Sequence, residues 1–171
     1  MIITCDDVHE GREAIRKLRA ETECNEKNLR LMECDLCSLD SVRQFAELFN
    51  NEEARLDVLI CNSSLMWSTH VVTKHGFNTI IQANYLSHFL LTNLLLHKLK
   101  QCRPSRIINV SSGAHQSLCN NNFPADHLST GLFFHSSCSK YQLVRCIDSI
   151  PKQSSLRCLY NIESISNIIN I

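Results

Sequence analysis

Two short apolar runs decide the fold of this chain: residues 56–61, which read LDVLIC, and residues 106–110, which read RIINV. Each run ends in small polar residues, NSS at residues 62–64 and SS at residues 111–112. Apolar runs of this length are typical of central parallel strands that helices cover on both faces. In open α/β sheets, ligands bind just beyond the carboxyl ends of such strands. The sequence therefore predicts a functional site at these two strand ends.

Strand-like and helix-like segments alternate along the rest of the chain. Further strands are expected at residues 1–5 and 29–34, where apolar residues dominate. Asp7 follows the first of these strands and Ser38 follows the second. Both residue types are favourable helix N-caps, so we expect a helix to begin after each strand.

Two more helices complete this alternation. A long apolar helix is expected from about residues 74–77 to Cys102, and another helix at residues 136–150. The resulting order, a helix after every strand, predicts a parallel sheet with right-handed crossovers. Residues 1–150 would form this single domain. Residues 151–171 follow no clean hydrophobic period and would form a divergent tail, disordered or weakly packed.

The charge and hydropathy of the chain exclude several classes of partner. Lys plus Arg and Asp plus Glu each number 17, so the formal net charge is zero. A balanced charge without a basic stripe argues against nucleic acid as a partner. The most apolar run, residues 89–96, is far shorter than the roughly 20 residues that a membrane helix needs. With no leader-like start, the chain is expected to be cytoplasmic, with no membrane span.

Ten cysteines are scattered through the chain rather than arranged as a disulfide framework. Reduced thiols are the expectation for a chain without a secretory leader. Cys34 and Cys37 have C-x-x-C spacing, but no second pair follows at the spacing of a zinc site. No metal site is predicted, and Cys34 is expected to be a core residue at the end of a strand.

Several local sequences occur in an order that is similar to one known family. They are residues 34–36 (CDL), 56–62 (LDVLICN), 84–96 (NYLSHFLLTNLLL), 105–115 (SRIINVSSGAH) and, more faintly, 136–140 (SSCSK). In these motifs the chain resembles the short-chain dehydrogenase/reductase family, and within it the retinol dehydrogenase-like branch. The resemblance implies a Rossmann-like three-layer fold, a parallel sheet with helices on both faces.

The resemblance also implies an activity. Family members use NAD or NADP to oxidise alcohols or reduce carbonyls, often on retinoid, steroid or other lipid-like substrates. Relatives are often anchored to the endoplasmic reticulum membrane. A tyrosine transfers the proton at the substrate oxygen, and a lysine one helical turn later favours the phenolate. A serine at a strand end contacts the substrate oxygen, and a helix asparagine holds a water.

The catalytic residues of the family carry over unevenly to this sequence. Ser112 matches the serine, Asn84 the asparagine and Lys140 the lysine. Ser136 occupies the position expected for tyrosine, and its hydroxyl has no accessible phenolate-like state. Tyr141 does not replace it, because one helical residue turns the side chain by about 100°.

Residue-based alternatives remain open at each of these positions. Ser112 could serve only as a cap at a strand end, and Lys140 could be an exposed helix lysine. Asn84 could hold a water or simply bend a buried helix. Asp35 could be an ordinary turn aspartate rather than a ligand contact.

The resemblance also identifies residues for a cofactor site. Asp35 matches an aspartate that contacts adenine, Asn62 begins the turn that reads N-A-G in the family, and Lys140 contacts the ribose. Asp6 stands where NADP-preferring members often carry a basic residue. Its charge would repel a 2′-phosphate, so the expected preference is NAD.

The glycine-rich loop that holds the cofactor pyrophosphate in the family has no counterpart here. The four glycines, Gly11, Gly76, Gly113 and Gly131, are too far apart to build a T-G-x-x-x-G-x-G loop. Residue 1 already falls in what resembles the second strand of the family. The fold is therefore expected to be incomplete, with the first strand and the last strands missing.

Two kinds of function follow. The chain could be an NAD(P)-dependent oxidoreductase that is catalytically impaired, because the glycine loop and the tyrosine are absent. It could instead be a non-catalytic remnant that binds a partner or forms a homodimer. Family resemblance would place such a dimer on the long helix and the Lys140 helix, with Leu90, Leu94 and Val144 contributing.

Overall fold

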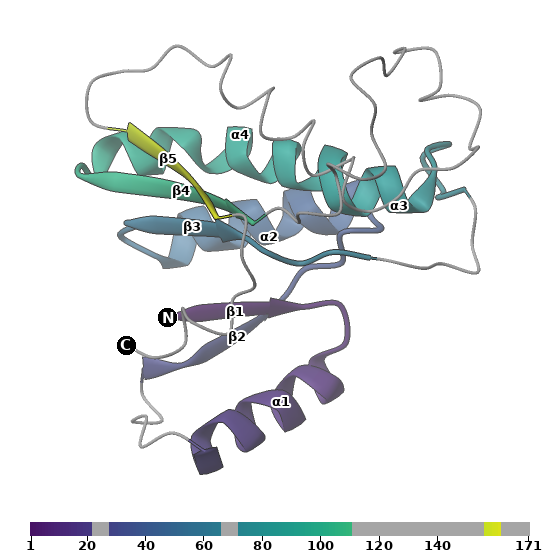
Figure 1. Ribbon diagram of the computed structural model, residues 1–171, viewed down its shortest axis with the longest axis horizontal. Helices are drawn as coiled ribbons and strands as arrows, with labels where there is room; N and C mark the ends of the chain where they lie inside the picture. The colour runs from purple at the N-terminus through teal and green to yellow at the C-terminus, as the bar shows by residue number, and fades with distance from the viewer. Residues whose placement is uncertain (22–27, 66–71, 111–155, 162–171) are drawn as a thin grey trace.

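The computed structural model describes residues 1–21, 28–65 and 72–110, together with the backbone of residues 156–161 (Figure 1). Several predictions lie outside the described residues. They concern the catalytic candidates Ser112, Ser136 and Lys140, the dimer residue Val144, and the helix at residues 136–150.

Strands and helices alternate as the sequence predicts. The elements, in chain order, are β1 (Ile2–Cys5), α1 (Val8–Glu21), β2 (Arg30–Glu33), α2 (Leu39–Glu52), β3 (Val58–Cys61), α3 (Thr79–Ile81), η2 (Gln82–Leu86), α4 (Ser87–Gln101), β4 (Ser105–Val110) and β5 (Leu156–Asn161). The two expected N-caps are confirmed. Asp7 Oδ1 accepts hydrogen bonds from the backbone of His9 and Glu10, and Ser38 Oγ accepts one from Ser41.

All strand pairs are parallel, but the strands form two separate sheets. One sheet contains β1 and β2, and the other has the order β3–β4–β5. Figure 1 shows every strand arrow pointing the same way, with α2 and α4 along the larger sheet and α1 beside the smaller one. The predicted parallel α/β fold is confirmed for the described residues.

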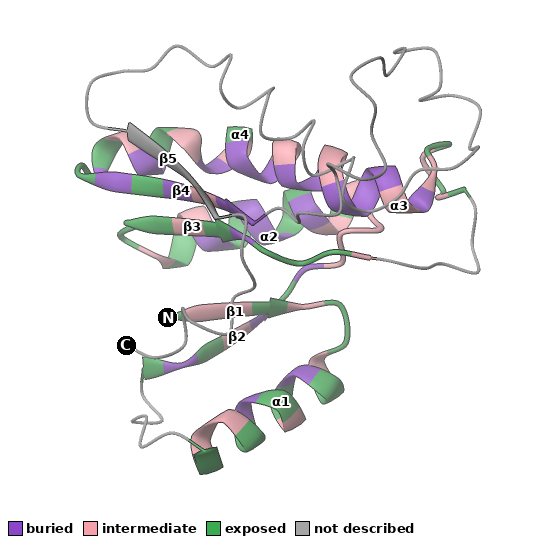
Figure 2. Cartoon of the chain, viewed as in Figure 1, coloured by how far each residue is buried: buried purple, intermediate pink, exposed green. Residues whose placement is uncertain are grey.

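The hydrophobic core lies between the larger sheet and the helices α2 and α4. Its buried members include Met32, Val42, Phe45, Phe49, Leu91, Leu95, Leu99 and Ile107. Figure 2 shows the buried residues of α4 and α2 gathered along the sides that face each other and the sheet. Leu99 and Ile107 are fully buried, so truncating either to alanine would cost about 2–5 kcal/mol of stability.

A buried lysine joins the two core helices. Lys98 of α4 is only 7% exposed, and its Nζ donates hydrogen bonds to the backbone oxygens of Asn50 (2.9 Å) and Glu53 at the end of α2. The same ammonium lies 5.8 Å from the centre of the Phe49 ring. Lys98 thus satisfies carbonyl groups that the end of α2 leaves without helical partners.

The expected long helix is divided near its start. It begins at Thr79, where the Asn78 side chain caps it, and passes through a π-helical turn, η2, before α4. A π-helical turn inserts one residue into the helical repeat, and such insertions are frequent at functional sites. Here the insertion contains Asn84, one of the predicted site residues.

Strand β3 differs from the prediction that it is covered on both faces. The side chains of Val58 and Ile60 are 43% and 46% exposed, whereas Cys61 is buried. Strand β4 pairs with one edge of β3, and no other described strand pairs with the opposite edge. Val58 and Ile60 are two residues apart and so lie on the same face of β3, and the described residues leave that face partly exposed.

The tail prediction needs a correction as well. Residues 156–161 lie within the segment expected to be disordered or weakly packed, yet they form β5, which pairs with β4 from Ser105 to Val110. Three large apolar residues in six give this run strand character, and the free edge of β4 supplies backbone partners. One strand beyond β4 is therefore present.

Candidate functional site

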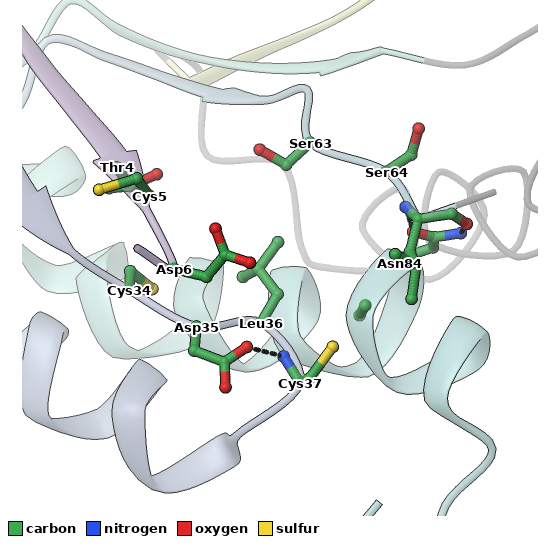
Figure 3. Close-up of a pocket in the computed structure, with 12 residues that line it drawn as sticks. Thr4, Cys5, Asp6, Cys34, Asp35, Leu36, Cys37, Ser63, Ser64 and Asn84 are labelled. Carbon is green, nitrogen blue, oxygen red and sulfur yellow. Dashed lines mark hydrogen bonds between the residues drawn. The ribbon is translucent and has the colours of Figure 1, made fainter. Parts of the chain in front are cut away.

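A pocket of about 270 Å³ lies where β1, β2 and β3 end. It is lined by Thr4, Cys5, Asp6, Cys34, Asp35, Leu36, Cys37, Ser63, Ser64, Leu65, Ala83 and Asn84 (Figure 3). Three strand ends and the η2 turn therefore contribute to one cavity. This is the place at which the parallel-sheet rule predicts a ligand site.

Asp6 follows the last residue of β1 and is exposed to solvent. Figure 3 shows its carboxylate directed into the space between Leu36 and Ser63. One carboxylate oxygen also accepts a 3.1 Å hydrogen bond from the backbone N–H of Asp7. Because the side chain of Asp7 already caps α1, the helix start beside the pocket does not offer those amides to a phosphate.

Asp35 lies at the end of β2 and is fixed by the turn that follows. Its Oδ1 accepts a 2.7 Å hydrogen bond from the backbone N–H of Cys37, and its own N–H donates to Ser41 Oγ at 3.0 Å. The carboxylate turns toward Cys37 rather than into the open part of the pocket (Figure 3). The residue thus performs the turn role that the sequence left open, while it still lines the pocket.

Asn84 is completely buried in η2 and holds the loop after β3. Its Oδ1 accepts a hydrogen bond from the N–H of Leu65 at 2.7 Å, and its Nδ2 donates to the Leu65 carbonyl at 2.9 Å. This pair of bonds fixes the backbone of one pocket-lining residue from both sides. The Asn84 side chain therefore positions the pocket wall in this structure.

Two further contacts secure the pocket rim. The ring Nε2 of His88 lies 2.9 Å from the backbone oxygen of Ser63, and Ser87 Oγ donates to the Leu36 carbonyl at 2.6 Å. Both donors come from the first turn of α4. They connect the ends of β3 and β2 to one helix, so the two strand ends keep a fixed separation.

Three cysteines line the pocket as neutral thiols. Burial raises the pKa of Cys34 to about 12, and burial followed by nearby carboxylates also raises the pKa values of Cys5 and Cys37. Thiols with raised pKa values are poor nucleophiles and poor metal ligands at neutral pH. Cys34 directly follows β2 and is 4% exposed, which confirms the prediction that it is a core residue. Within the described part of the chain, no group of three or more His, Cys, Asp or Glu residues could hold a metal ion.

The chemistry of the lining suits one end of a nucleotide. The Asp6 carboxylate could accept hydrogen bonds from ribose hydroxyl groups, and the side chains of Leu36 and Ala83 could offer apolar surface to a flat base. The same carboxylate disfavours a phosphate at that position. The described residues therefore fit the adenosine end of a dinucleotide.

The structure brings together three predicted cofactor residues and one predicted catalytic residue, Asn84. Asp6, Asp35 and Asn84 line one pocket, and Asn62 lies beside it, next to Ser63 and Ser64, which line it. Sequence reasoning missed Thr4, Cys5, Leu36 and Ala83 as lining residues. Three of these lie at strand ends, so applying the strand-end rule to β1 and β2 would have found them.

Comparisons with known proteins agree with the geometry. The family model described as short chain dehydrogenase matches residues 2–123. Retinol dehydrogenase 13 of Homo sapiens is 46% identical over 115 residues, which are 67% of this chain and 34% of that protein. Retinol dehydrogenase 12 of Mus musculus is 42% identical over 113 residues, 66% of this chain and 35% of that protein. The chain thus spans about a third of the length of these relatives.

Solved structures share the fold. A metagenomic short-chain oxidoreductase in complex with NADP gives a TM-score of 0.65 at 23% identity, over 93% of this chain and 68% of that chain. An NADPH-bound carbonyl reductase from chicken fatty liver gives a TM-score of 0.63 at 19% identity, over 93% of this chain and 66% of that chain. Across the described ranges, none of the helices is long and apolar enough to cross a membrane.

Proposed function

The chain belongs to the short-chain dehydrogenase family, and on this premise we propose that it binds the adenosine end of a nicotinamide dinucleotide without catalysing turnover. The observation that carries the proposal is the pocket at three strand ends with the Asp6 carboxylate directed into it. Relatives of this chain include retinol dehydrogenases, so the dinucleotide chemistry would concern an alcohol or carbonyl substrate.

Within this site, Asp6 would accept hydrogen bonds from the adenosine ribose, and Leu36 and Ala83 would contact the base. Asn84 would contribute indirectly, because it holds the Leu65 backbone that forms one wall. The substrate class we infer is a small lipophilic alcohol or carbonyl compound, by likeness to the relatives.

The preferred dinucleotide would be NAD rather than NADP. Five of the similar solved structures contain NADP, NADPH or 5-hydroxy-NADP, but those proteins are at most 23% identical to this chain. A 2′-phosphate carries close to two negative charges, and at about 5 Å from Asp6 in a water-like dielectric the repulsion is roughly 1–2 kcal/mol. That repulsion corresponds to about a tenfold loss of affinity.

Catalysis would be impaired for a chemical reason. A bound nicotinamide supplies hydride transfer, but the substrate oxygen also needs a group that exchanges its proton. Ser136 stands at the tyrosine position of the family, and a serine hydroxyl is far too weak an acid for Lys140 to activate. Ser112 and Lys140 match family positions, yet neither would supply the missing proton transfer.

The test combines binding with turnover. Purified full chain should show NADH binding by cofactor fluorescence and a melting temperature that rises with NADH, because a ligand of the folded state stabilises it. No NAD-dependent oxidation of retinol should be detected, either for the unmodified chain or for Ser136→Tyr, because the variant restores the tyrosine but not the glycine-rich loop that holds the pyrophosphate in the family. The absence of any NADH binding would refute the binding proposal, and turnover by Ser136→Tyr would refute the account of the impairment.

A homodimer through α4 stays a prediction. Leu90 and Leu94, which the sequence analysis assigned to the interface, are partly buried and pack against the core. They could offer only the rest of their surface to a second copy. Sedimentation equilibrium of the full chain, with Leu90→Lys as the disrupting variant, would measure whether such a dimer forms.

A further inference from the structure

A turn of residues 72–78 precedes α3 and contacts the start of α2 through one histidine. The turn closes on itself, since Val72 and Asn78 form an isolated antiparallel bridge. The Nε2 atom of His75 accepts a 3.2 Å hydrogen bond from the backbone N–H of Leu39, the first residue of α2. The first amides of a helix have no partner within the helix, so His75 satisfies one of them.

The turn holds the histidine in place through its own hydrogen bonds. The N–H of His75 donates to Thr73 Oγ1 at 3.3 Å, and the N–H of Gly76 donates to the Thr73 carbonyl at 2.9 Å. Gly76 has a φ of 80°, a conformation that glycine adopts without strain. Thr73 Oγ1 donates in turn to Oε1 of the buried Gln82 at 2.6 Å. The turn is therefore attached to η2 on one side and, through His75, to α2 on the other.

The hydrogen bond from Leu39 requires one protonation state of the imidazole. A histidine nitrogen that accepts a hydrogen bond carries no proton, so the single proton of the neutral ring lies on Nδ1. When a second proton binds, both ring nitrogens become donors. The N–H groups of His75 and Leu39 would then face each other, and the positive ring would lie at the positively polarised start of α2. Protonation of His75 therefore breaks the contact with Leu39.

The charged groups around His75 offer the protonated ring another partner. Asp40 Oδ2 lies 3.8 Å from Nε2 and also pairs with Lys74 Nζ at 2.9 Å. The hydrogen bond from Lys74 holds the pKa of Asp40 below its ordinary value, so this carboxylate is charged at any pH where histidines titrate. Arg43, also on α2, donates to the Leu39 carbonyl at 3.3 Å. Asp40 thus attracts the protonated ring, whereas the charges of Lys74 and Arg43 oppose it.

We propose that His75 is a pH-sensitive latch between the turn of residues 72–78 and α2. The neutral ring holds the Leu39 amide through Nε2. The protonated ring releases that amide and pairs with the Asp40 carboxylate, which lies near the same nitrogen. Histidine is the side chain that ordinarily changes charge between about pH 5 and 8. Because the neutral ring makes the contact, the latch is closed at the upper end of this range and opens as the pH falls.

Amide hydrogen exchange of the full chain tests the latch. From about pH 7.5 to about pH 5, the protection factor of the Leu39 amide should fall at least about fivefold, after correction for the intrinsic effect of pH on exchange. The amide of Leu95, in the buried core of α4, should keep its protection and so exclude general unfolding. A Leu39 protection factor that is equal at both pH values would overturn the proposal.

Three variants separate the latch from other titrating groups. His75→Gln places an amide oxygen where Nε2 now accepts, so the Leu39 amide should keep its protection at both pH values. His97→Gln changes an exposed histidine of α4 and should leave the pH dependence unchanged. Asp40→Asn removes the second partner of the protonated ring and should move the midpoint of the Leu39 transition to lower pH by at least about half a unit. A pH dependence that persists in His75→Gln would overturn the latch, and an unchanged midpoint in Asp40→Asn would overturn the exchange of partners.

The latch also connects two walls of the pocket at the strand ends. The turn before α2 lines that pocket through Leu36 and Cys37, and η2 lines it through Ala83 and Asn84. On the proposed function, on which this consequence rests, NADH affinity should fall about threefold or more from about pH 7.5 to about pH 5.5, but not in His75→Gln. An equal fall in both proteins, or none in either, would overturn the connection to the pocket. No NADH binding at either pH would refute the proposed function, while the exchange result would still decide the latch.

Discussion

The replacement Asn84→Asp tests whether the clamp on Leu65 shapes the site. The aspartate keeps an oxygen that accepts from the Leu65 N–H, but it puts a second oxygen where Nδ2 now donates to the Leu65 carbonyl at 2.9 Å. Asn84 is fully buried, so solvent does not screen this contact. The folded protein would tolerate the change only if the new carboxyl kept a proton and donated it.

The cost can be worked out from that proton. Keeping the new carboxyl protonated in the folded state costs about 1.4 kcal/mol for each pH unit above the ordinary Asp pKa near 3.9, or up to about 4 kcal/mol near pH 7. Partial opening of the loop that contains Leu65 limits this cost. We therefore expect Asn84→Asp to lower the free energy of unfolding by about 3 kcal/mol near pH 7 and by under about 1 kcal/mol near pH 4. The folded state of the variant binds the proton more tightly than the unfolded state does. Its stability relative to the unmodified chain therefore falls as the pH rises above about 4.

Urea unfolding at both pH values measures this difference. Asn93→Asp is the matched control, because Asn93 Nδ2 also donates to a backbone oxygen, that of Phe89 at 2.8 Å, but at an exposed position. We expect Asn93→Asp to lower the free energy of unfolding by under about 1 kcal/mol at either pH. Equal losses for the two variants near neutral pH would refute the inference that the Asn84 clamp is both buried and required.

Two further predictions concern buried polar groups. Lys98→Met keeps the length of the side chain but leaves the carbonyls of Asn50 and Glu53 without their donor. Urea unfolding should therefore show a free energy of unfolding that is lower by about 1–3 kcal/mol. Lys100→Met, at a half-buried position on the same helix, should lower the free energy of unfolding by under about 0.5 kcal/mol. Burial raises the pKa of Cys34 to about 12, so its thiol should resist iodoacetamide at mildly alkaline pH in the folded chain. After unfolding in urea, the same thiol should react. Mass spectrometry of the labelled peptides measures both results. Equal labelling of Cys34 in both states would contradict its burial.

Local sequence patterns were sufficient to predict the strands β1 to β4, the caps at Asp7 and Ser38, and the end of β3 as one wall of the pocket. These features depend on neighbouring residues in the sequence. The role of Asn84 depends on Leu65, a partner 19 residues away, and the π-helical turn that holds it breaks the 3.6-residue period used to predict helices. Neither could be read from a local window.

The exposed face of β3 was missed for a different reason. An apolar run predicts burial on the assumption that a neighbouring element covers it, but the described residues leave the side chains of Val58 and Ile60 43% and 46% exposed. β5 was missed because its run, LRCLYN, is neither continuously apolar nor strictly alternating. In both cases the outcome depends on how distant elements assemble around the strand, which a local run of residues does not contain.

The central claim is that the Asp6 pocket selects NAD. The most direct measurement is the NADPH dissociation constant divided by the NADH dissociation constant. It is made for the unmodified chain, for Asp6→Asn and for the control Glu47→Gln. The control removes an equal charge from an exposed position outside the pocket. We predict a ratio of about ten or more for the unmodified chain and for Glu47→Gln, and a ratio of about three or less for Asp6→Asn. Tighter binding of NADPH than NADH, or a ratio that Asp6→Asn leaves unchanged, would contradict the account.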